Sequence, residues 1–280
     1  MKHVYLVDAE TGEVISEVAS YRTVKQQEAW ARIYKLKEMR KATHAPFVAC
    51  YHAPIRAKMD KLSLTDAGAL LKLIMKIRID KKGKLYYGRS TYLTQYHCQH
   101  LFDRSQNRTA EILKRLEALD LLTSKREGRY LTYSIDEAFH CRGKLRKQKF
   151  TKLALTDTSF KSINLLTLTE SGFLYKLLPF VHFKTNQIVD NPNEFEVSKL
   201  RLFSRNQLAK ELKCDVKGVT KMMKSLSEKR IIQIKTIKKS HCYRIHPDVM
   251  YRKYGTGIDT ESNKLRDSFL SEENQGNIRS

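Results

Sequence analysis

The chain has 280 residues, and its 53 Lys and Arg side chains against 30 Asp and Glu give a formal charge of +23. This length suggests about two domains of roughly 100–200 residues each, and the charge predicts polyanionic partners, with nucleic acid ahead of acidic membrane surfaces. No run of about 18 apolar residues and no signal-peptide pattern occurs, so we expect no membrane partner. Five scattered cysteines argue against a disulfide framework and for a reducing cytoplasm.

The N-terminal stretch predicts a β-hairpin followed by a helix. Residues 4–7 (VYLV) and 13–18 (EVISEV) flank a turn in which Gly12 is placed for a positive φ. Helical spacing then predicts a helix over Lys25–Arg40. We interpret this helix as a lid on the domain that follows, with a third DNA contact or a dimerisation arm as alternatives.

An internal repeat organises the rest of the chain. Residues 61–74 (KLSLTDAGALLKLI) and 165–178 (LLTLTESGFLYKLL) are identical at seven of fourteen positions, at an offset of 104 residues. Each copy predicts an apolar entry segment, a Thr N-cap with an acid in the first turn, and an amphipathic helix. Chance similarity of two Leu-rich helices is the alternative, and the elements that follow each copy weigh against it.

The same order of elements follows both copies. After the first we expect, in chain order, a strand at Leu85–Gly88, a short helix at Ser90–Cys98, a longer helix from Ser105, and a hairpin over residues 121–135 that turns at Glu127 and Gly128. After the second we expect a strand at residues 187–190, a short helix at Phe203–Lys213, a longer helix capped by Asp215 with Val219, Met222, Met223 and Leu226 inward, and a hairpin over residues 231–245 that turns near Lys238–Ser240. The offset is now 110 residues, so the second copy has about six extra residues in the loop before its short helix.

Helix, strand, helix, helix and hairpin is the order of a winged helix-turn-helix, in which the third helix enters the major groove and the hairpin reaches phosphate or the minor groove. We therefore predict a mainly helical α+β fold with two tandem winged helix-turn-helix domains, an N-terminal β-hairpin and a helix. The predicted parts are the N-terminal hairpin and helix (1–58), the first winged helix (59–144), a basic joint with the second winged helix (145–255), and a flexible acidic tail (256–280). The joint includes the strand-like sequence FTKLALT (150–156), so we do not interpret it as a free linker.

The outward faces of the longer helices and the hairpin tips are the candidate DNA contacts. Arg suits guanine and Asn or Gln suits adenine, whereas Lys mainly binds phosphate. The predicted DNA-binding residues are Gln106, Asn107, Arg108, Lys114, Arg115, Lys125, Arg126, Arg129, Lys217, Thr220, Lys221, Lys224, Lys238 and Lys239. Residues 105–130 hold six cations against four acids, and residues 215–244 hold nine against two. We therefore expect both copies to bind, the second with the larger share of the salt dependence; the alternative is that one copy is a dimerisation or scaffold module.

Motifs for catalysis or metal binding are weak. His241 and Arg244 lie in a predicted hairpin strand, too close to Tyr251 and Tyr254 for a tyrosine recombinase. The adjacent His-Cys pairs lack the paired C-x₂-C spacing of zinc sites, and no phosphate-loop motif occurs. We predict no catalytic residues, no metal and no cofactor.

Five stretches resemble tandem winged-helix proteins encoded by phages and plasmids of Gram-positive bacteria. They are VYLVDAETGEV (4–14), EAFHCRGK (137–144), SGFLYKLLPFVHF (171–183), TNQIVDNPNE (185–194) and YRIHPDVMYRKYG (243–255). The second copy is also similar to the plasmid replication-initiator family with one winged helix. This resemblance covers most of residues 1–255 and implies DNA binding for a mobile element, in gene control or origin recognition.

We therefore expect a non-enzymatic, sequence-specific double-stranded DNA-binding protein of the bacterial cytoplasm, associated with the nucleoid. Transcriptional regulation for a phage or plasmid is the leading function. Replication initiation at the origin repeats of a mobile element is the alternative, and nucleoprotein organisation is a second one. Self-association into a dimer stays open.

Overall fold

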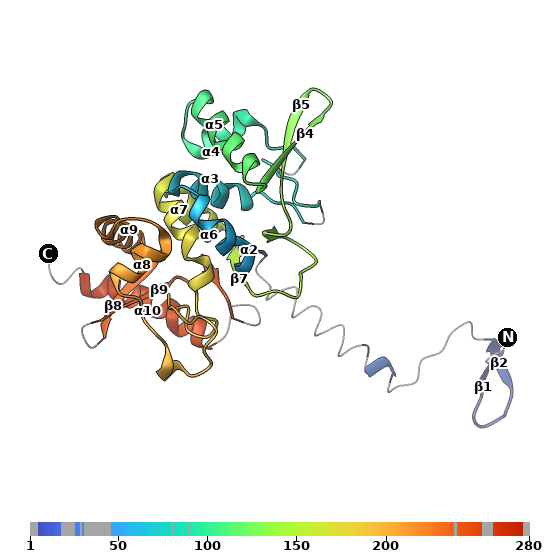
Figure 1. The fold of residues 1–280 in the computed structure, drawn as a ribbon. Helices are drawn as coiled ribbons and strands as arrows, with labels where there is room; N and C mark the ends of the chain where they lie inside the picture. Colours follow the sequence, from blue (N-terminus) through green and yellow to red (C-terminus); the bar gives the residue numbers. More distant parts are fainter. Residues whose placement is uncertain are drawn as a thin grey trace. The chain divides into compact units, whose positions relative to one another are not determined.

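The computed structural model describes residues 5–17, 26–28, 30, 46–79, 81–88, 90–237, 240–253 and 260–276, with Glu17, Ile237 and residues 271–276 described by their backbone only. The chain divides into two compact units, residues 1–44 and 45–280, and each is described by itself (Figure 1). The described residues form helices and small antiparallel sheets, so the predicted α+β class is confirmed.

The first unit contains the predicted hairpin. Strands β1 (Tyr5–Val7) and β2 (Val14–Glu17) are antiparallel. The Asp8 carboxylate accepts hydrogen bonds from the backbone N–H groups of the turn, and Gly12 has a φ of +72°. Most of the helix predicted at Lys25–Arg40 lies outside the described residues.

The second unit begins with a four-stranded antiparallel sheet that both copies of the repeat build. Its strand order is β10-β7-β3-β6, with β10 (Met250–Tyr251), β7 (Phe150–Ala154), β3 (Phe47–Tyr51) and β6 (His140–Cys141). Strand β7 is the strand-like part of the predicted joint. One apolar core continues through both copies, so the copies share a sheet and a core.

The helices and hairpins recur in the same order in each copy (Figure 1). The first copy has α2 (His52–Lys58), α3 (Leu64–Ile74), α4 (Gln95–Phe102), α5 (Gln106–Ala118), β4 (Leu122–Glu127) and β5 (Tyr130–Ile135). The second copy has α6 (Asp157–Asn164), α7 (Leu168–Leu177), α8 (Arg205–Leu212), α9 (Val216–Glu228), β8 (Ile232–Ile237) and β9 (Ser240–Ile245). A short strand segment pairs with each hairpin, through bridges of Lys84 with Ser134 and of Gln187 with Arg244.

Two contacts between the copies are reciprocal, as they are about an approximate two-fold axis. In the pair β3–β7 the register is reciprocal about Ala49 and Lys152, so equivalent residues exchange partners. Helices α3 and α7 cross where Gly68 faces the Leu168 carbonyl and Gly172 faces the Leu64 carbonyl. A Cβ atom at Gly68 or Gly172 would lie 1.8 Å or 1.7 Å from those carbonyl oxygens. The two glycines matched in the sequence repeat are therefore what allows the helices to approach so closely.

Two expectations differ from the structure near helix ends. The N-cap of α3 is Ser63, two residues before the expected Thr65, and its hydroxyl accepts from the Asp66 N–H at 3.1 Å. In the second copy the expected Thr cap is confirmed, because Thr167 caps α7 with Glu170 in the first turn. Helix α4 begins at Gln95 and not near Ser90, because Tyr92 is held in a bridge with Tyr86.

The tail is also more ordered than expected. Residues Thr260–Gly276 form helix α10. Its Phe269 side chain is 6% exposed and packs edge-on against His246, while Arg266 bonds to Asp248 at 2.6 Å and 2.7 Å. The flexible tail predicted for 256–280 is wrong over this helix, because apolar and ionic partners on the second copy hold it.

Candidate nucleic-acid interface

Helix α5 presents one apolar and one polar side, as its spacing predicts. Ser105 is the N-cap, and the buried side consists of Thr109, Ile112, Leu113 and Leu116. On the other side, Gln106, Asn107, Arg108 and Lys114 are exposed. The Arg108 guanidinium lies 3.0 Å from the Glu111 carboxylate, but its side chain remains 72% exposed. The predicted base-reading residues therefore face solvent together at the N-terminal end of α5.

Arg115 has a different environment from the other predicted contacts. Its guanidinium donates to both carboxylate oxygens of Asp66 on α3, at 2.7–3.1 Å. The Asp66 side chain is only 5% exposed, and the hydrogen bond to Asp66 raises the pKa of Arg115. This bidentate pair is a clamp that ties α5 to α3, so Arg115 has a structural role. Its side chain is still 49% exposed, and its predicted contact with DNA stays a prediction.

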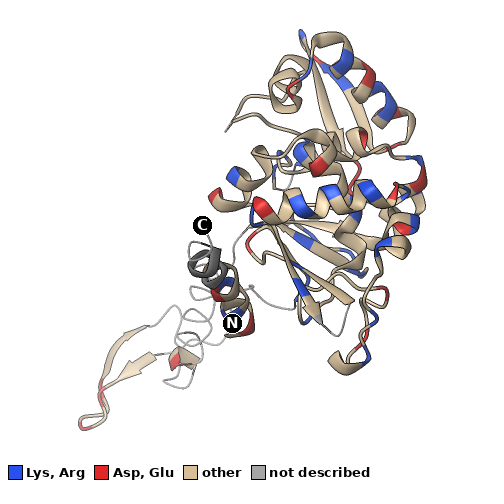
Figure 2. Ribbon diagram, turned by 90° about the vertical axis from the view of Figure 1, so that its left-hand side faces the viewer, with Lys and Arg blue, Asp and Glu red and all other residues tan. Residues whose placement is uncertain are grey.

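Helix α9 repeats this arrangement in the second copy. The Asp215 carboxylate accepts from the Gly218 N–H at 2.7 Å, which confirms the predicted cap. Val219, Met223 and Leu226 are buried and Met222 is half-buried, as predicted. The predicted contact residues Lys217, Thr220, Lys221 and Lys224 are all exposed. Figure 2 views the molecule from the side on which α8 and α9 lie in Figure 1, and Lys and Arg recur along the helices there.

A second clamp ties α9 to α7. Glu170, the repeat equivalent of Asp66, accepts from the Lys229 ammonium at 2.6 Å and 2.7 Å and from the Ser225 hydroxyl. Burial alone would raise the pKa of Glu170, but the hydrogen bonds from Lys229, Ser225 and Thr167 outweigh it and lower the pKa to about 2. Lys229 therefore stabilises the fold through its ion pair with Glu170, although it is also one of the nine cations of residues 215–244.

The first hairpin presents cations at its tip. Lys125, Arg126 and Arg129 are exposed, and Gly128 adopts a φ of +62° in the turn between β4 and β5. The Arg129 guanidinium lies 4.9 Å from the centre of the Tyr130 ring. The predicted contacts Lys238 and Lys239, at the tip of the second hairpin, lie outside the described residues.

One polar group near this surface was not singled out from the sequence. Arg205, the first residue of α8, has its guanidinium 2.8 Å from His241 Nε2 on β9. This contact connects the short helix to the second hairpin, across 36 residues of sequence. No local pattern could reveal it, because each residue alone resembles any exposed cation or imidazole.

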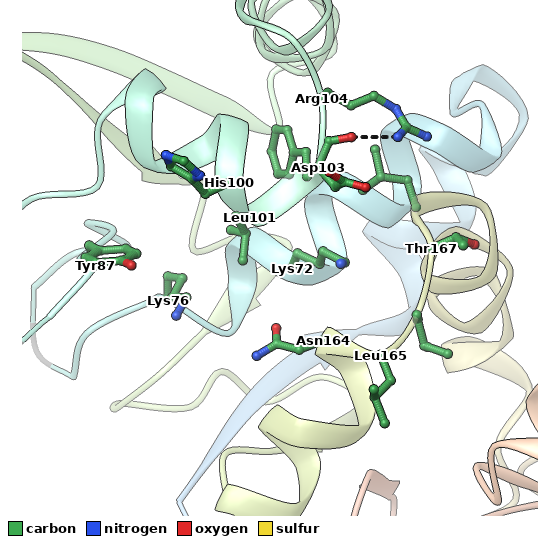
Figure 3. A pocket seen from close by; sticks show the side chains of 13 residues that line it. Lys72, Lys76, Tyr87, His100, Leu101, Asp103, Arg104, Asn164, Leu165 and Thr167 are labelled. Carbon is green, nitrogen blue, oxygen red and sulfur yellow. Dashed lines mark hydrogen bonds between the residues drawn. The ribbon is translucent and has the colours of Figure 1, made fainter.

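A pocket of about 470 Å³ lies between the two copies, and Arg104 in its wall directly precedes Ser105, the N-cap of α5. Figure 3 shows Lys72 on α3 and Lys76 in the turn that follows it, among side chains of α4, of the turn after α4, and of the segment that joins α6 to α7. The sequence repeat included Lys72 and Lys176 as an identical pair, but nothing in the sequence indicated that their surroundings differ.

Comparison with known protein families, with curated protein sequences and with solved structures gave no match. Among the described residues, no helix combines the length and apolarity that crossing a bilayer requires. The same part of the chain contains no group of three His, Cys, Asp or Glu side chains arranged to hold a metal ion.

Proposed function

We propose that the protein is a sequence-specific double-stranded DNA-binding protein that regulates transcription, and that each copy of the repeat is a winged helix-turn-helix. The observation that carries this proposal is the repeated order of α3-α4-α5-hairpin and α7-α8-α9-hairpin, each with a short strand bridged to its hairpin. In DNA-binding proteins of this order, the third helix lies in the major groove and the hairpin contacts phosphates beside it.

The chemistry of the exposed faces supports the proposal. Lys217, Lys221 and Lys224 project from α9 toward solvent, while its apolar side is buried. On α5, Gln106, Asn107 and Arg108 are side-chain types that form hydrogen bonds with base edges. We infer that α5 reads sequence and that α9 supplies more of the phosphate binding.

The two-fold relation between the copies predicts the form of the target. Operator symmetry mirrors protein symmetry, and two half-sites lie roughly one helical turn or a multiple apart. Since α5 and α9 expose different side chains, the inverted half-sites should differ in sequence. A single chain would then act on DNA as a dimer does.

Selection from random duplexes at about 150 mM salt tests this function. We expect an enriched sequence with two inverted, unequal half-sites, bound at least about a thousandfold more tightly than non-specific DNA. Asn107→Ala and Arg108→Ala should relax the preference in one half-site only, whereas Lys210→Ala, on the exposed surface of α8, should not. No preferred duplex would overturn the proposal, and selected direct repeats would contradict the two-fold arrangement.

Footprinting on the genome that encodes the protein then identifies the role. A site that overlaps a promoter supports regulation. Iterated sites beside an AT-rich segment would instead support a role in replication initiation. Uniform coverage of the DNA would support a role in nucleoprotein organisation.

A further inference from the structure

We infer that the pocket between the copies, lined by Lys72, Lys76 and Arg104, binds a small molecule that carries a phosphate group. This inference is independent of DNA binding, because none of these three residues belongs to the predicted contact set. The volume of about 470 Å³ lies within the range of small-molecule sites. Figure 3 shows how the lining side chains are arranged.

Lys72 is the central observation. It is only 6% exposed and lines the pocket. Within the described part of the chain, its ammonium makes no hydrogen bond and no salt bridge. Burial lowers the pKa of Lys72, and Asp103 and Glu170 only partly oppose this effect. The Lys72 ammonium is not itself fully enclosed, so it can meet a ligand in the pocket, where a bound anion would supply the opposite charge and the hydrogen-bond acceptors.

The other walls also favour an anion. Lys76, in the turn that follows α3, also lines the pocket, and burial lowers its pKa too. Arg104 follows the C-terminal end of α4 and is exposed. Thr167 and Leu168 bring the first turn of α7 into the wall, where the Glu170 carboxylate and the Thr167 hydroxyl already accept from the N–H groups of Thr167 and Glu170. Asp103 is the acid among the described lining residues, and it is exposed.

The equivalent residues of the second copy do not line such a pocket, so the fold of a copy does not by itself require one. Lys176, the equivalent of Lys72, donates to the Leu212 carbonyl at the end of α8 at 3.1 Å. The position of Lys76 is taken by Phe180, which is buried and packs edge-on against Phe203. Cys214 stands at the position of Arg104. The second copy therefore uses its lysine to cap a helix, whereas the first leaves its lysine facing an open pocket.

Binding of inorganic phosphate and pyrophosphate to the full chain, measured by calorimetry at constant ionic strength, tests the inference. We expect saturable binding with one site per chain, weakened about tenfold or more in Lys72→Met and in Lys76→Met. Methionine keeps most of the apolar stem of each side chain. Lys76 is less buried than Lys72, so Lys76→Met still tests the inference if Lys72→Met does not fold. Lys210→Met, which removes an exposed charge on α8, is the matched control and should bind phosphate as the unchanged protein does.

Three results would overturn the inference. The first is the absence of saturable phosphate binding. The second is equal weakening in Lys210→Met, which would indicate a general effect of charge. The third is a loss of DNA affinity in Lys72→Met without any phosphate binding by the unchanged protein, which would assign the lysine to a DNA backbone phosphate.

Discussion

At the N-terminal end of α7, the buried Glu170 carboxylate meets the Lys229 ammonium at 2.6 Å. Its repeat equivalent Asp66 meets Arg115 at 2.7 Å. Arg115 lies within α5 and Lys229 directly follows α9, and these pairs connect α5 to α3 and the end of α9 to α7. Both copies therefore use an acid–base pair to connect these helices, although the basic residue lies at a different position in each copy.

Glu170→Gln should destabilise the protein in a pH-dependent way. The folded-state pKa of Glu170 is about 2, below its ordinary 4.5, so its ionised form stabilises the fold above about pH 4.5 and this contribution is lost as the pH falls toward 2. We expect the variant to lose about 2 kcal/mol of unfolding free energy at pH 7, measured by urea denaturation, and less at pH 3.

Glu228→Gln is the control for that measurement. Its carboxylate lies 3.9 Å from Lys224 and is 63% exposed, so the change should have little effect at either pH. A gap between the unchanged protein and Glu170→Gln that is equal at pH 3 and pH 7 would show that the carboxylate charge is not what stabilises the clamp.

At the scale of elements, α9 combines a buried apolar stripe with exposed lysines. Each phosphate contact contributes about 0.9 to the slope of log K against log salt concentration. Replacing Lys217, Lys221 and Lys224 by Ala should therefore lower the slope by about 2 to 3, as measured by fluorescence anisotropy with the selected duplex.

The triple variant needs a control with the same loss of charge. Lys161, Lys210 and Lys264 are exposed and lie on α6, α8 and α10. Their replacement by Ala should change the slope much less, because these three lysines are not among the predicted DNA contacts. If both triple variants lower the slope equally, α9 has no special role in phosphate binding.

Much of each element was predictable from the sequence. The caps Ser105 and Asp215, the inward residues of α5 and α9, and the first hairpin all follow from patterns within a few residues. Helix α4 and the tail were not predictable in this way. A bridge between Tyr86 and Tyr92 delays α4, and contacts with His246 and Asp248 stabilise α10.

At the scale of the whole molecule, the crossing of α3 and α7 decides how the copies are placed. The Cβ atom of Gly172→Ala would lie 1.7 Å from the Leu64 carbonyl oxygen, so the helices would have to separate. We expect a loss of about 3 kcal/mol in thermal or urea unfolding, with Gly68→Ala behaving similarly.

Gly88→Ala is the matched control, since no atom lies within 4 Å of the Cβ it would add. It should leave stability nearly unchanged. If Gly172→Ala is as stable as Gly88→Ala, then the close approach of α3 and α7 does not stabilise the arrangement of the two copies.

The repeat, the order of its elements, the Asp215 cap and the excess of positive charge are readable from the amino-acid sequence. This is because helix periodicity, capping and turns depend on neighbouring residues. The folded structure was needed to show that the copies share one sheet about Ala49 and Lys152, that Asp66 and Glu170 pair with Arg115 and Lys229, and that Lys72 faces a pocket while Lys176 caps a helix. These outcomes depend on partners tens of residues away, and identical residues in the two copies meet different partners there.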